Sequence, residues 1–182
     1  MECSMKEAIR TILQHIGENP DREGLQDTPK RVEAAWSELT AGYQQRPEEI
    51  LSTTFEGEDY DEMVVVKNIE FHSMCEHHMM PFIGKAHVAY LPEDRVVGLS
   101  KIPRLVHCFA RRLQIQERLT GEISSTLHSI LKTKGVGVVI EASHLCLSCR
   151  GIKQQGSTMI TSSLLGVFRK PEVRAEFLSL VR

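Results

Sequence analysis

Long apolar runs and a strong excess of charge are both missing from this sequence. No apolar run approaches the roughly 20 residues that a membrane-spanning helix needs. The N-terminal M-E-C-S-M-K-E opens with an acidic residue and lacks the apolar region of a secretory signal. The formal net charge is −2 with the histidines neutral. We therefore expect a cytoplasmic protein that binds neither a membrane nor nucleic acid, since nucleic-acid binding usually needs a broad basic face.

A secreted disulfide framework is not expected either. The chain of 182 residues has an odd number of cysteines, namely Cys3, Cys75, Cys108, Cys146 and Cys149. An odd count in a chain of this length argues against pairing throughout. In a reducing compartment, cysteines that cluster with histidines are more typical of metal ligands or catalysts. We find no repeats, low-complexity segments or linkers.

Hydrophobic periodicity predicts an α+β protein. Helical spacing covers residues 4–16, where Ser4 and Glu7 form a capping box, and a second helix begins near Asp27-Thr28-Pro29. Alternating segments then predict strands, two long helices follow, and further strands and a C-terminal helix complete the chain. The predicted strands lie near residues 63–71, 85–91, 95–99, 135–142 and 158–166, and the predicted helices start at 100, 115 and 171.

This order predicts an antiparallel sheet with a helix pair on one face. A turn at residues 92–95 is expected to join the second and third strands. We expect an N-terminal helical region over residues 1–60, and a sheet-bearing domain over residues 61–182 that acts as one unit.

The stretch S-M-C-E-H-H-M-M-P-F at residues 73–82 concentrates groups that bind metals. Cys75 and His78 are three residues apart, so a helical turn or a tight knuckle would place both on one metal ion. Cys146, in H-L-C-L-S-C just after a predicted strand, is the expected third ligand. Three protein ligands with an open position are typical of catalytic zinc, whereas Cys149 as a fourth ligand would make the site structural. Both alternatives stay open, beside the possibility that the cysteines are simply buried thiols.

Two further histidines lie next to these candidate ligands. If His78 binds a metal, the adjacent His77 points elsewhere and is free to titrate, and neutral imidazole is a ready acid or base near pH 7. His144 precedes Cys146 by two residues and would share its strand face. It is a candidate for proton transfer or for support of the ligand, with a structural histidine as the alternative.

Several ordered motifs resemble those of the GTP cyclohydrolase I family. They are S-M-C-E-H-H at 73–78, G-K-A-H-V-A-Y at 84–90, G-L-S-K-I-P-R at 98–104, F-A-R-R-L-Q-I-Q-E-R-L-T at 109–120 and H-L-C-L-S-C-R-G at 144–151, with D-T-P-K-R-V at 27–32. The resemblance implies the tunnelling fold, in which subunits form β-barrel rings that stack as two pentamers into a homodecamer with sites between subunits. It implies GTP as the substrate and Zn2+ as the cofactor, held by Cys75, His78 and Cys146.

The resemblance also assigns roles in the reaction, which opens the guanine imidazole ring at C8 and releases formate and 7,8-dihydroneopterin triphosphate. His77 would protonate N7, and His144 would assist proton transfer. Glu117 resembles the guanine anchor and Gln116 the ribose contact. The triphosphate ligands would be Ser100, Lys101, Arg104, Arg150 and Arg31.

One position departs from the family pattern. Cys149 stands where related chains usually carry an apolar residue, often Met. It is either a packed thiol in that place, a fourth zinc ligand, or a thiol that can pair with Cys146 on oxidation. The corresponding alternative function is a non-catalytic zinc-binding relative with a structural or regulatory role. Another tunnelling-fold enzyme acting on a different pterin or purine is a third interpretation, which the full set of expected GTP contacts disfavours.

Overall fold

The computed structural model describes residues 4–57 and 60–182. The chain divides into two compact units, residues 1–41 and 42–182. The division that we predicted at residue 60 separates regions by their expected role and stays a prediction.

The first unit is a pair of helices, as predicted. Its elements are α1 (Met5–His15), the short 3₁₀ helix η1 (Glu23–Leu25) and α2 (Thr28–Leu39). The capping box is present, because the Glu7 amide donates to Ser4 Oγ at 3.3 Å and the Ser4 amide donates to Glu7 Oε2 at 2.8 Å. Gly17, with φ of 89°, follows the end of α1 in the left-handed conformation that glycine adopts at low cost. Local capping signals therefore set the limits of α1.

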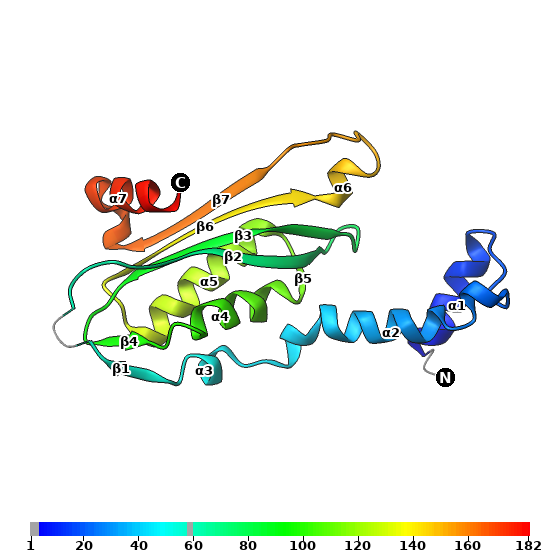
Figure 1. The fold of residues 1–182 in the computed structure, drawn as a ribbon, viewed down its shortest axis with the longest axis horizontal. Helices are drawn as coiled ribbons and strands as arrows, with labels where there is room; N and C mark the ends of the chain where they lie inside the picture. Colours follow the sequence, from blue (N-terminus) through cyan, green and yellow to red (C-terminus); the bar gives the residue numbers. More distant parts are fainter. Residues whose placement is uncertain (1–3, 58–59) are drawn as a thin grey trace. The chain divides into compact units, whose positions relative to one another are not determined.

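The second unit carries the strands and the remaining helices (Figure 1). Its strands are β1 (Thr54–Glu56), β2 (Val64–Cys75), β3 (Pro81–Leu91), β4 (Arg95–Val97), β5 (Leu113–Gln114), β6 (Gly135–His144) and β7 (Met159–Gly166). Its helices are η2 (Ala41–Gln44, which begins at the boundary), α3 (Pro47–Ile50), α4 (Lys101–Ala110), α5 (Gln116–Leu131), α6 (Leu145–Ser148), η3 (Val167–Arg169) and α7 (Pro171–Val181).

The main sheet has five strands in the order β5-β2-β3-β6-β7. Four of them pair antiparallel, as expected, while the two-residue β5 runs parallel to the end of β2. The strand after the predicted turn, β4, lies outside the main sheet, because it pairs with β1 in a separate two-stranded sheet. The buried Tyr90 hydroxyl accepts the Val97 amide hydrogen at 3.1 Å and so ties β4 to the end of β3.

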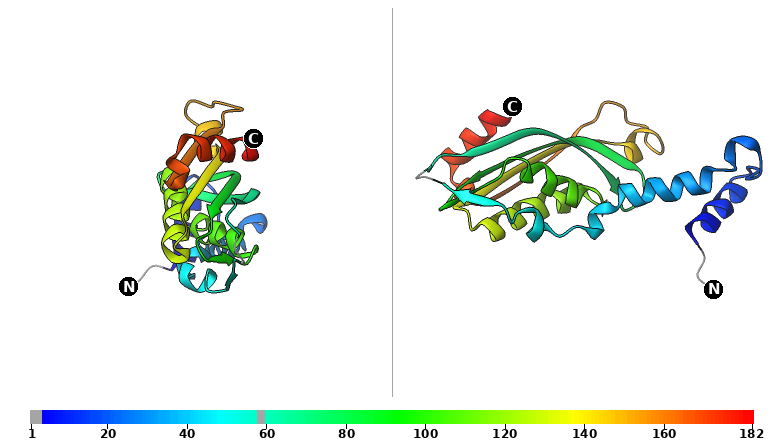
Figure 2. Two further views of the ribbon diagram at one scale, coloured as in Figure 1. Left: turned by 90° about the vertical axis from the view of Figure 1, so that its left-hand side faces the viewer. Right: turned by 60° about the horizontal axis from the view of Figure 1, so that its bottom comes forward.

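Alternation along the strands produces two apolar layers. One face of the sheet packs on α4 and α5, where Phe82, Val88 and Ile140 meet helix residues such as Leu105 and Ile123. On the other face Ala89 packs with Phe168 and Phe177, which come from η3 and α7. Figures 1 and 2 show the helix pair and α7 on opposite sides of the strands. The predicted helix pair on one face is confirmed.

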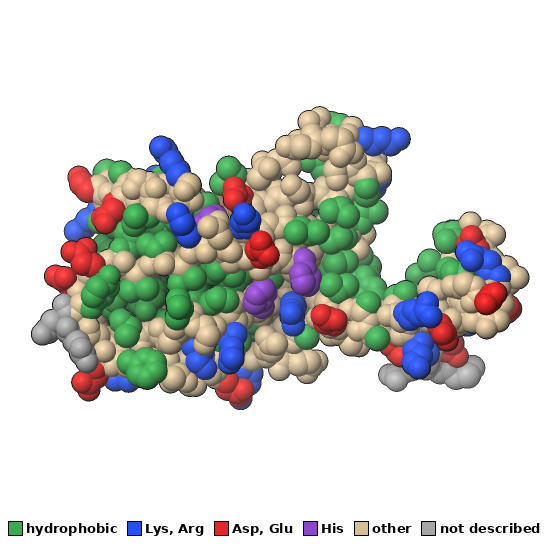
Figure 3. All heavy atoms as spheres, in the orientation of Figure 1, with side chains coloured by type: hydrophobic (Ala, Val, Ile, Leu, Met, Phe, Trp, Pro, Cys, Tyr) green, Lys and Arg blue, Asp and Glu red, His purple; other side chains and the backbone are tan. Residues whose placement is uncertain are grey.

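No helix within residues 4–57 and 60–182 is long and apolar enough to cross a bilayer. The face shown in Figure 3 carries basic and acidic side chains interspersed, rather than one continuous basic patch. This distribution agrees with the small net charge of −2.

Candidate metal centre and surrounding site

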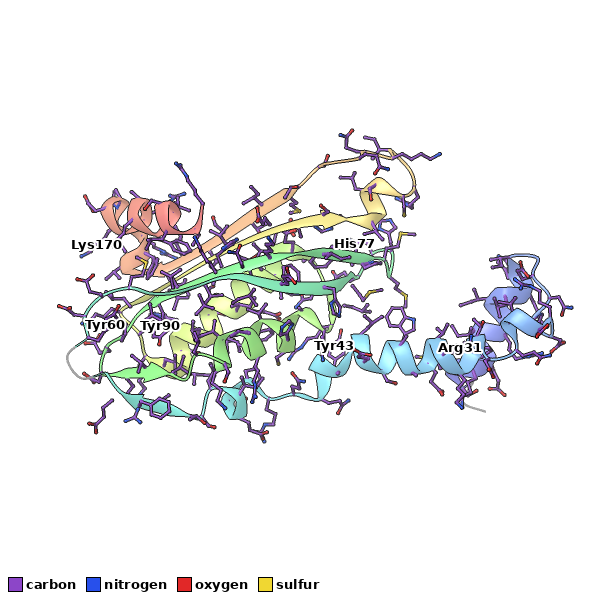
Figure 4. All side chains as sticks on the ribbon, viewed as in Figure 1. Arg31, Tyr43, Tyr60, His77, Tyr90 and Lys170 are labelled. Carbon is purple, nitrogen blue, oxygen red and sulfur yellow. The ribbon has the colours of Figure 1, made fainter. Side chains whose placement is uncertain are left out.

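The turn between β2 and β3 carries two of the candidate ligands. Cys75 is the last residue of β2, and its amide donates to the Met80 carbonyl at 2.8 Å while the Met79 amide donates to the Cys75 carbonyl at 2.8 Å. Met79 adopts the left-handed conformation with φ of 53°. These contacts close a tight turn, the second of the two geometries that the spacing of Cys75 and His78 allowed. Figure 4 shows His77 at this end of the β2–β3 hairpin.

Strand pairing brings the third candidate ligand to the same place. β3 and β6 pair with Phe82 opposite His144, so the end of β6 lies beside the start of β3. The chain then enters α6, which contains Cys146. The ligand atoms of Cys75, His78 and Cys146 lie within 4.8 Å of one another, and this group could hold a metal ion.

The chemistry of this group favours a soft or borderline cation. Two thiolates and one imidazole are a donor set typical of zinc. Burial raises the pKa of the Cys146 thiol above its ordinary value, and the neighbouring Cys75 raises it further. A divalent cation would reverse this tendency, because metal binding deprotonates a coordinating thiol. The residues therefore fit a zinc ion.

Cys149 lies outside this group of three ligand atoms among the described residues. Its side chain is exposed, and its Sγ lies 3.8 Å from Met80 Sδ. The exposure disfavours a tightly packed thiol at this position. A three-ligand site, which leaves a position open, is the arrangement that the geometry favours.

His77 is the largely exposed neighbour of the candidate ligand His78. Its side chain is 65% exposed, and its Nε2 lies 4.0 Å from Glu76 Oε1. Its ring stands at 74° to the His78 ring, with the centroids 6.3 Å apart. Both imidazoles lie near the first thiol, because Nδ1 of His77 and Nδ1 of His78 are 3.9 and 4.0 Å from Cys75 Sγ. Only His78 has a ligand atom within 4.8 Å of those of both cysteines, and the ring of His77 stays open to a bound molecule.

His144 is held on two sides. Its ring stacks on Phe82 at 4.7 Å with an interplanar angle of 3°, and its Nε2 lies 2.8 Å from Gln116 Oε1. Burial lowers the pKa of His144, an effect that the nearby Glu117 carboxylate partly opposes. The imidazole is therefore held neutral in a fixed plane.

Gln116 is fully engaged inside the protein. Its Nε2 donates to the carbonyls of Ile140 and Met159 and to Thr161 Oγ1, all between 3.0 and 3.1 Å. The residue is 1% exposed. The ribose contact predicted for Gln116 stays a prediction. Glu117 follows in the first turn of α5.

The residues expected to bind phosphate occur in separate places. Lys101 and Arg104 line neighbouring cavities of about 290 and 400 Å³ between α3 and α4, and Arg104 lines both. Ser100 stands at the N-cap position of α4, but its side chain makes no capping hydrogen bond. Arg150 donates from Nε to the Cys146 carbonyl at 3.2 Å and so lies beside the metal group. Arg31, in the first unit, pairs with Asp27 at 3.3 Å.

Sequence reasoning missed a polar network beneath the ligand turn. Arg118 pairs with Glu76, and the buried Gln114 bonds both Arg118 and Glu122. Glu76 stands inside the C-E-H-H motif, and this position was the available signal. Its charge partner is 42 residues away in the chain and is placed only by folding.

Comparison with known proteins identifies the class to which this fold and site belong. The family model for GTP cyclohydrolase I matches residues 5–182. The chain therefore belongs to the GTP cyclohydrolase I family.

Two curated relatives are similar over nearly the whole chain. A protein of Wolinella succinogenes named GTP cyclohydrolase 1 is 53% identical over 182 residues, which span all of this chain and 97% of the relative. One of Brucella canis with the same name is 56% identical over 177 residues, or 96% of this chain and 83% of the relative. Among solved structures, the archaeosine synthase QueF-Like in its apo form covers 57% of this chain and 93% of its own, with 15% identity and a TM-score of 0.48.

Proposed function

We propose that this protein is a zinc-dependent GTP cyclohydrolase I. It converts GTP and water to 7,8-dihydroneopterin triphosphate and formate by hydrolytic opening of the guanine imidazole ring at C8. The observation that carries the proposal is the three-membered ligand group, whose atoms lie within 4.8 Å of one another in a chain of this family. His77 and His144 beside it supply groups for proton transfer.

Cys75, His78 and Cys146 would hold the zinc ion. A zinc ion bound there would lower the pKa of water to about 7 and would thereby supply a nucleophile at neutral pH. The protein fixes the ligands through the closed β2–β3 turn and the β3–β6 pairing. Because Cys149 lies outside the group, three protein ligands leave a position for the reaction.

His77 would act as the acid that protonates guanine N7. The exposed imidazole can approach a bound base, and a histidine side chain is the most common general acid in enzymes. Protonation of N7 makes C8 a better electrophile.

His144 would assist proton transfer from a fixed position. With Nε2–H donated to Gln116, its Nδ1 keeps the lone pair and can accept a proton. The stack on Phe82 holds the ring plane while this occurs.

The two ends of GTP need protein groups of opposite charge. Guanine presents N1–H and N2–H donors side by side, and the Glu117 carboxylate matches them. The triphosphate requires cations, which Lys101, Arg104, Arg150 and Arg31 would supply, with Ser100 at the N-terminal end of α4. Gln116 would contact the ribose.

We further propose that the enzyme is a homodecamer of two pentameric rings with active sites between subunits. The residues that line the Lys101 and Arg104 cavities include none of the three metal-group residues. Arg150 lies beside the metal group of its own chain, and a second copy would supply Lys101 and Arg104 to that group. Within the described chain β7 pairs on one side with β6 alone, so its outer edge is available to another subunit. The four described cysteines are free thiols, which fits a cytoplasmic enzyme.

Turnover of GTP by the zinc-loaded protein tests the proposal. We expect formate and, after oxidation, fluorescent neopterin to form in equal amounts. Removal of zinc by a chelator should abolish both products, and restored zinc should recover them. A zinc-loaded protein that leaves GTP intact would contradict the proposed function.

A further inference from the structure

One residue of α5, Arg118, connects that helix to the turn that bears the proposed ligands. Its guanidinium forms an ion pair with the Glu76 carboxylate and donates from Nη2 to the Leu113 carbonyl at 3.4 Å. Its Nε donates to Gln114 Oε1 at 2.9 Å. Arg118 therefore binds Glu76 in the turn and both residues of β5 at once.

The support beneath Arg118 is rigid. Gln114 is 2% exposed, and its Nε2 donates to the Phe109 carbonyl at 3.1 Å and to Glu122 Oε2 at 2.7 Å. The side chain that orients Arg118 is thus fixed by α4 on one side and by α5 on the other. A positioning contact needs such a fixed base.

The remaining connection between β5 and the turn is slight. The parallel pairing of β2 with β5 covers two residue pairs, Met74 with Leu113 and Cys75 with Gln114. Beyond it, the Glu76 amide donates to the Gln114 carbonyl at 3.0 Å. Without Arg118 the side chain of residue 76 would lose its anchor, and residue 76 lies between a proposed ligand and His77.

The exposure of the pair indicates that stability is not its main contribution. The side chains of Arg118 and Glu76 are 40% and 34% exposed. Pairs that are this accessible contribute little to folding stability, because water screens them. A bidentate or shared guanidinium, by contrast, restricts geometry closely.

The contacts of Arg118 join two parts of the proposed site, helix α5 and the ligand turn, whose relative position must be fixed. Glu117, the proposed guanine anchor, immediately precedes Arg118 on α5. Glu76 immediately follows Cys75 and precedes His77, and its Oε1 lies 4.0 Å from His77 Nε2. The Arg118–Glu76 pair thus couples the residue that would bind guanine to the turn that would act on it.

We propose that Arg118 is a positioning residue, which acts through Glu76 to hold the ligand turn and His77 in register with α5. This inference rests on the proposed function. It assigns Arg118 no contact with substrate or metal.

Zinc affinity and steady-state kinetics of the full-length protein test the proposal. Arg118→Met removes the charge and the fork but keeps an unbranched apolar stem. Loss of a residue that orients metal ligands typically weakens metal binding by about 10- to 100-fold. We expect a loss of this size in competition with a chelator, together with a lower kcat and a KM for GTP changed by less than about threefold, since Glu117 stays in place. The Co2+-substituted protein should show shifted thiolate-to-metal bands.

Three comparisons make the result specific. Arg112→Met is the matched control, because Arg112 also bonds a backbone carbonyl, that of Cys108 at 3.0 Å, while its guanidinium lies over the rings of Phe109 and Tyr43 and does not pair with Glu76. It should keep the zinc affinity and the Co2+ spectrum of the wild type. Glu76→Gln should reproduce the losses of Arg118→Met, and the double variant should lose no more than either single variant. Arg118→Lys should bind zinc more tightly than Arg118→Met, because it keeps a positive charge for Glu76. It should bind zinc less tightly than the wild type, because an ammonium group reaches fewer of the partners of Arg118.

Several outcomes would overturn the proposal. One is that Arg118→Met keeps a zinc affinity and a kcat within twofold of the wild-type values. Equal losses in Arg112→Met, or additive losses in the double variant, would also overturn it. If Arg118→Met does not fold, Glu76→Gln tests the same contact. If the wild type binds zinc but makes no formate, the proposed function fails, while the affinity and Co2+ comparisons still decide the role of Arg118.

Discussion

The Gln116 side chain determines which nitrogen of His144 carries the proton. Nε2 of Gln116 faces two backbone carbonyls, which accept hydrogen bonds and cannot donate them. Its Oε1, 2.8 Å from His144 Nε2, must therefore act as the acceptor. His144 thus carries its proton on Nε2 and presents the Nδ1 lone pair. A single buried amide fixes both the plane and the tautomer of the imidazole.

Gln116→Met should therefore lower both stability and turnover. The change leaves buried carbonyls without a donor, which costs about 1–3 kcal/mol of unfolding free energy, and it frees His144 to rotate or change tautomer. Urea denaturation and kcat measure the two effects. Thr161→Val is the control, since it removes one acceptor of Gln116 but keeps the contact with His144, and kcat should stay near the wild-type value. An unchanged kcat in Gln116→Met would contradict this account.

Acidification should destabilise the fold through a histidine far from the proposed ligands. His87 is 4% exposed, and burial lowers its pKa, while Glu141, at 3.8 Å, opposes this effect and Lys67 and Lys85 add to it. Because its folded pKa lies below the unfolded value near 6.5, the unfolded chain binds more protons in the window below about pH 6.5. The contribution of His87 to the free energy of unfolding should be complete above that pH. It should decrease as the pH falls through the window.

Urea midpoints between pH 7.5 and 5 measure this dependence. His87→Gln removes the titrating group and keeps an acceptor for the Asn68 amide, which lies 3.4 Å from His87 Nδ1. The variant should show a shallower decrease than the wild type. Parallel curves for the two proteins would exclude His87 as a source of the dependence.

Cys149 should be dispensable for metal binding. The side chain lies outside the three-membered group, so Cys149→Ala should retain one zinc ion per chain and near wild-type turnover. Cys146→Ser removes a proposed ligand and should lower zinc affinity strongly. Zinc content after dialysis separates the two variants. Loss of zinc from Cys149→Ala would instead support a closed, four-ligand site.

Sites shared between subunits predict complementation. Cys75→Ser and Lys101→Ala should each inactivate a uniform oligomer, one through the metal group and the other through phosphate binding. When the two variants are unfolded together and reassembled, some sites should combine an intact metal group with an intact Lys101. Recovery of formate release above that of either variant is expected. No recovery, despite mixed oligomers shown by mass spectrometry, would place the whole site in one chain.

Local sequence signals predicted most of the elements because those elements are set locally. The Ser4–Glu7 capping box sets the start of α1, and alternation sets the long strands. The two-residue β5 and the pairing of β4 with β1 escaped prediction, since each depends on contacts between distant segments rather than on periodicity. Leu113 and Gln114 are too short a run to show alternation.

The candidate site also has one part that the sequence predicted and another part that it did not. Cys75 and His78 stand close in sequence, and the strand before Cys146 indicated where the third ligand would come from. The family resemblance confirmed by comparison added the substrate. Neither the spacing nor the resemblance indicated the amide of Gln116 as the group that orients His144, or Arg118 as the partner of Glu76. Both contacts arise where α5 packs against strand ends, and side-chain geometry at such junctions is not encoded in a short motif.

Formate release by zinc-loaded His77→Ala, beside the wild type, tests the central claim most directly. His77 is 65% exposed and lies outside the three-ligand group, so its removal should leave the zinc content unchanged. We predict that the wild type releases formate from GTP and that the variant loses about 100-fold or more in kcat, in line with the loss of a general acid. Wild-type formate release from the zinc-loaded variant would contradict the proposed role of His77 and the mechanism built on it.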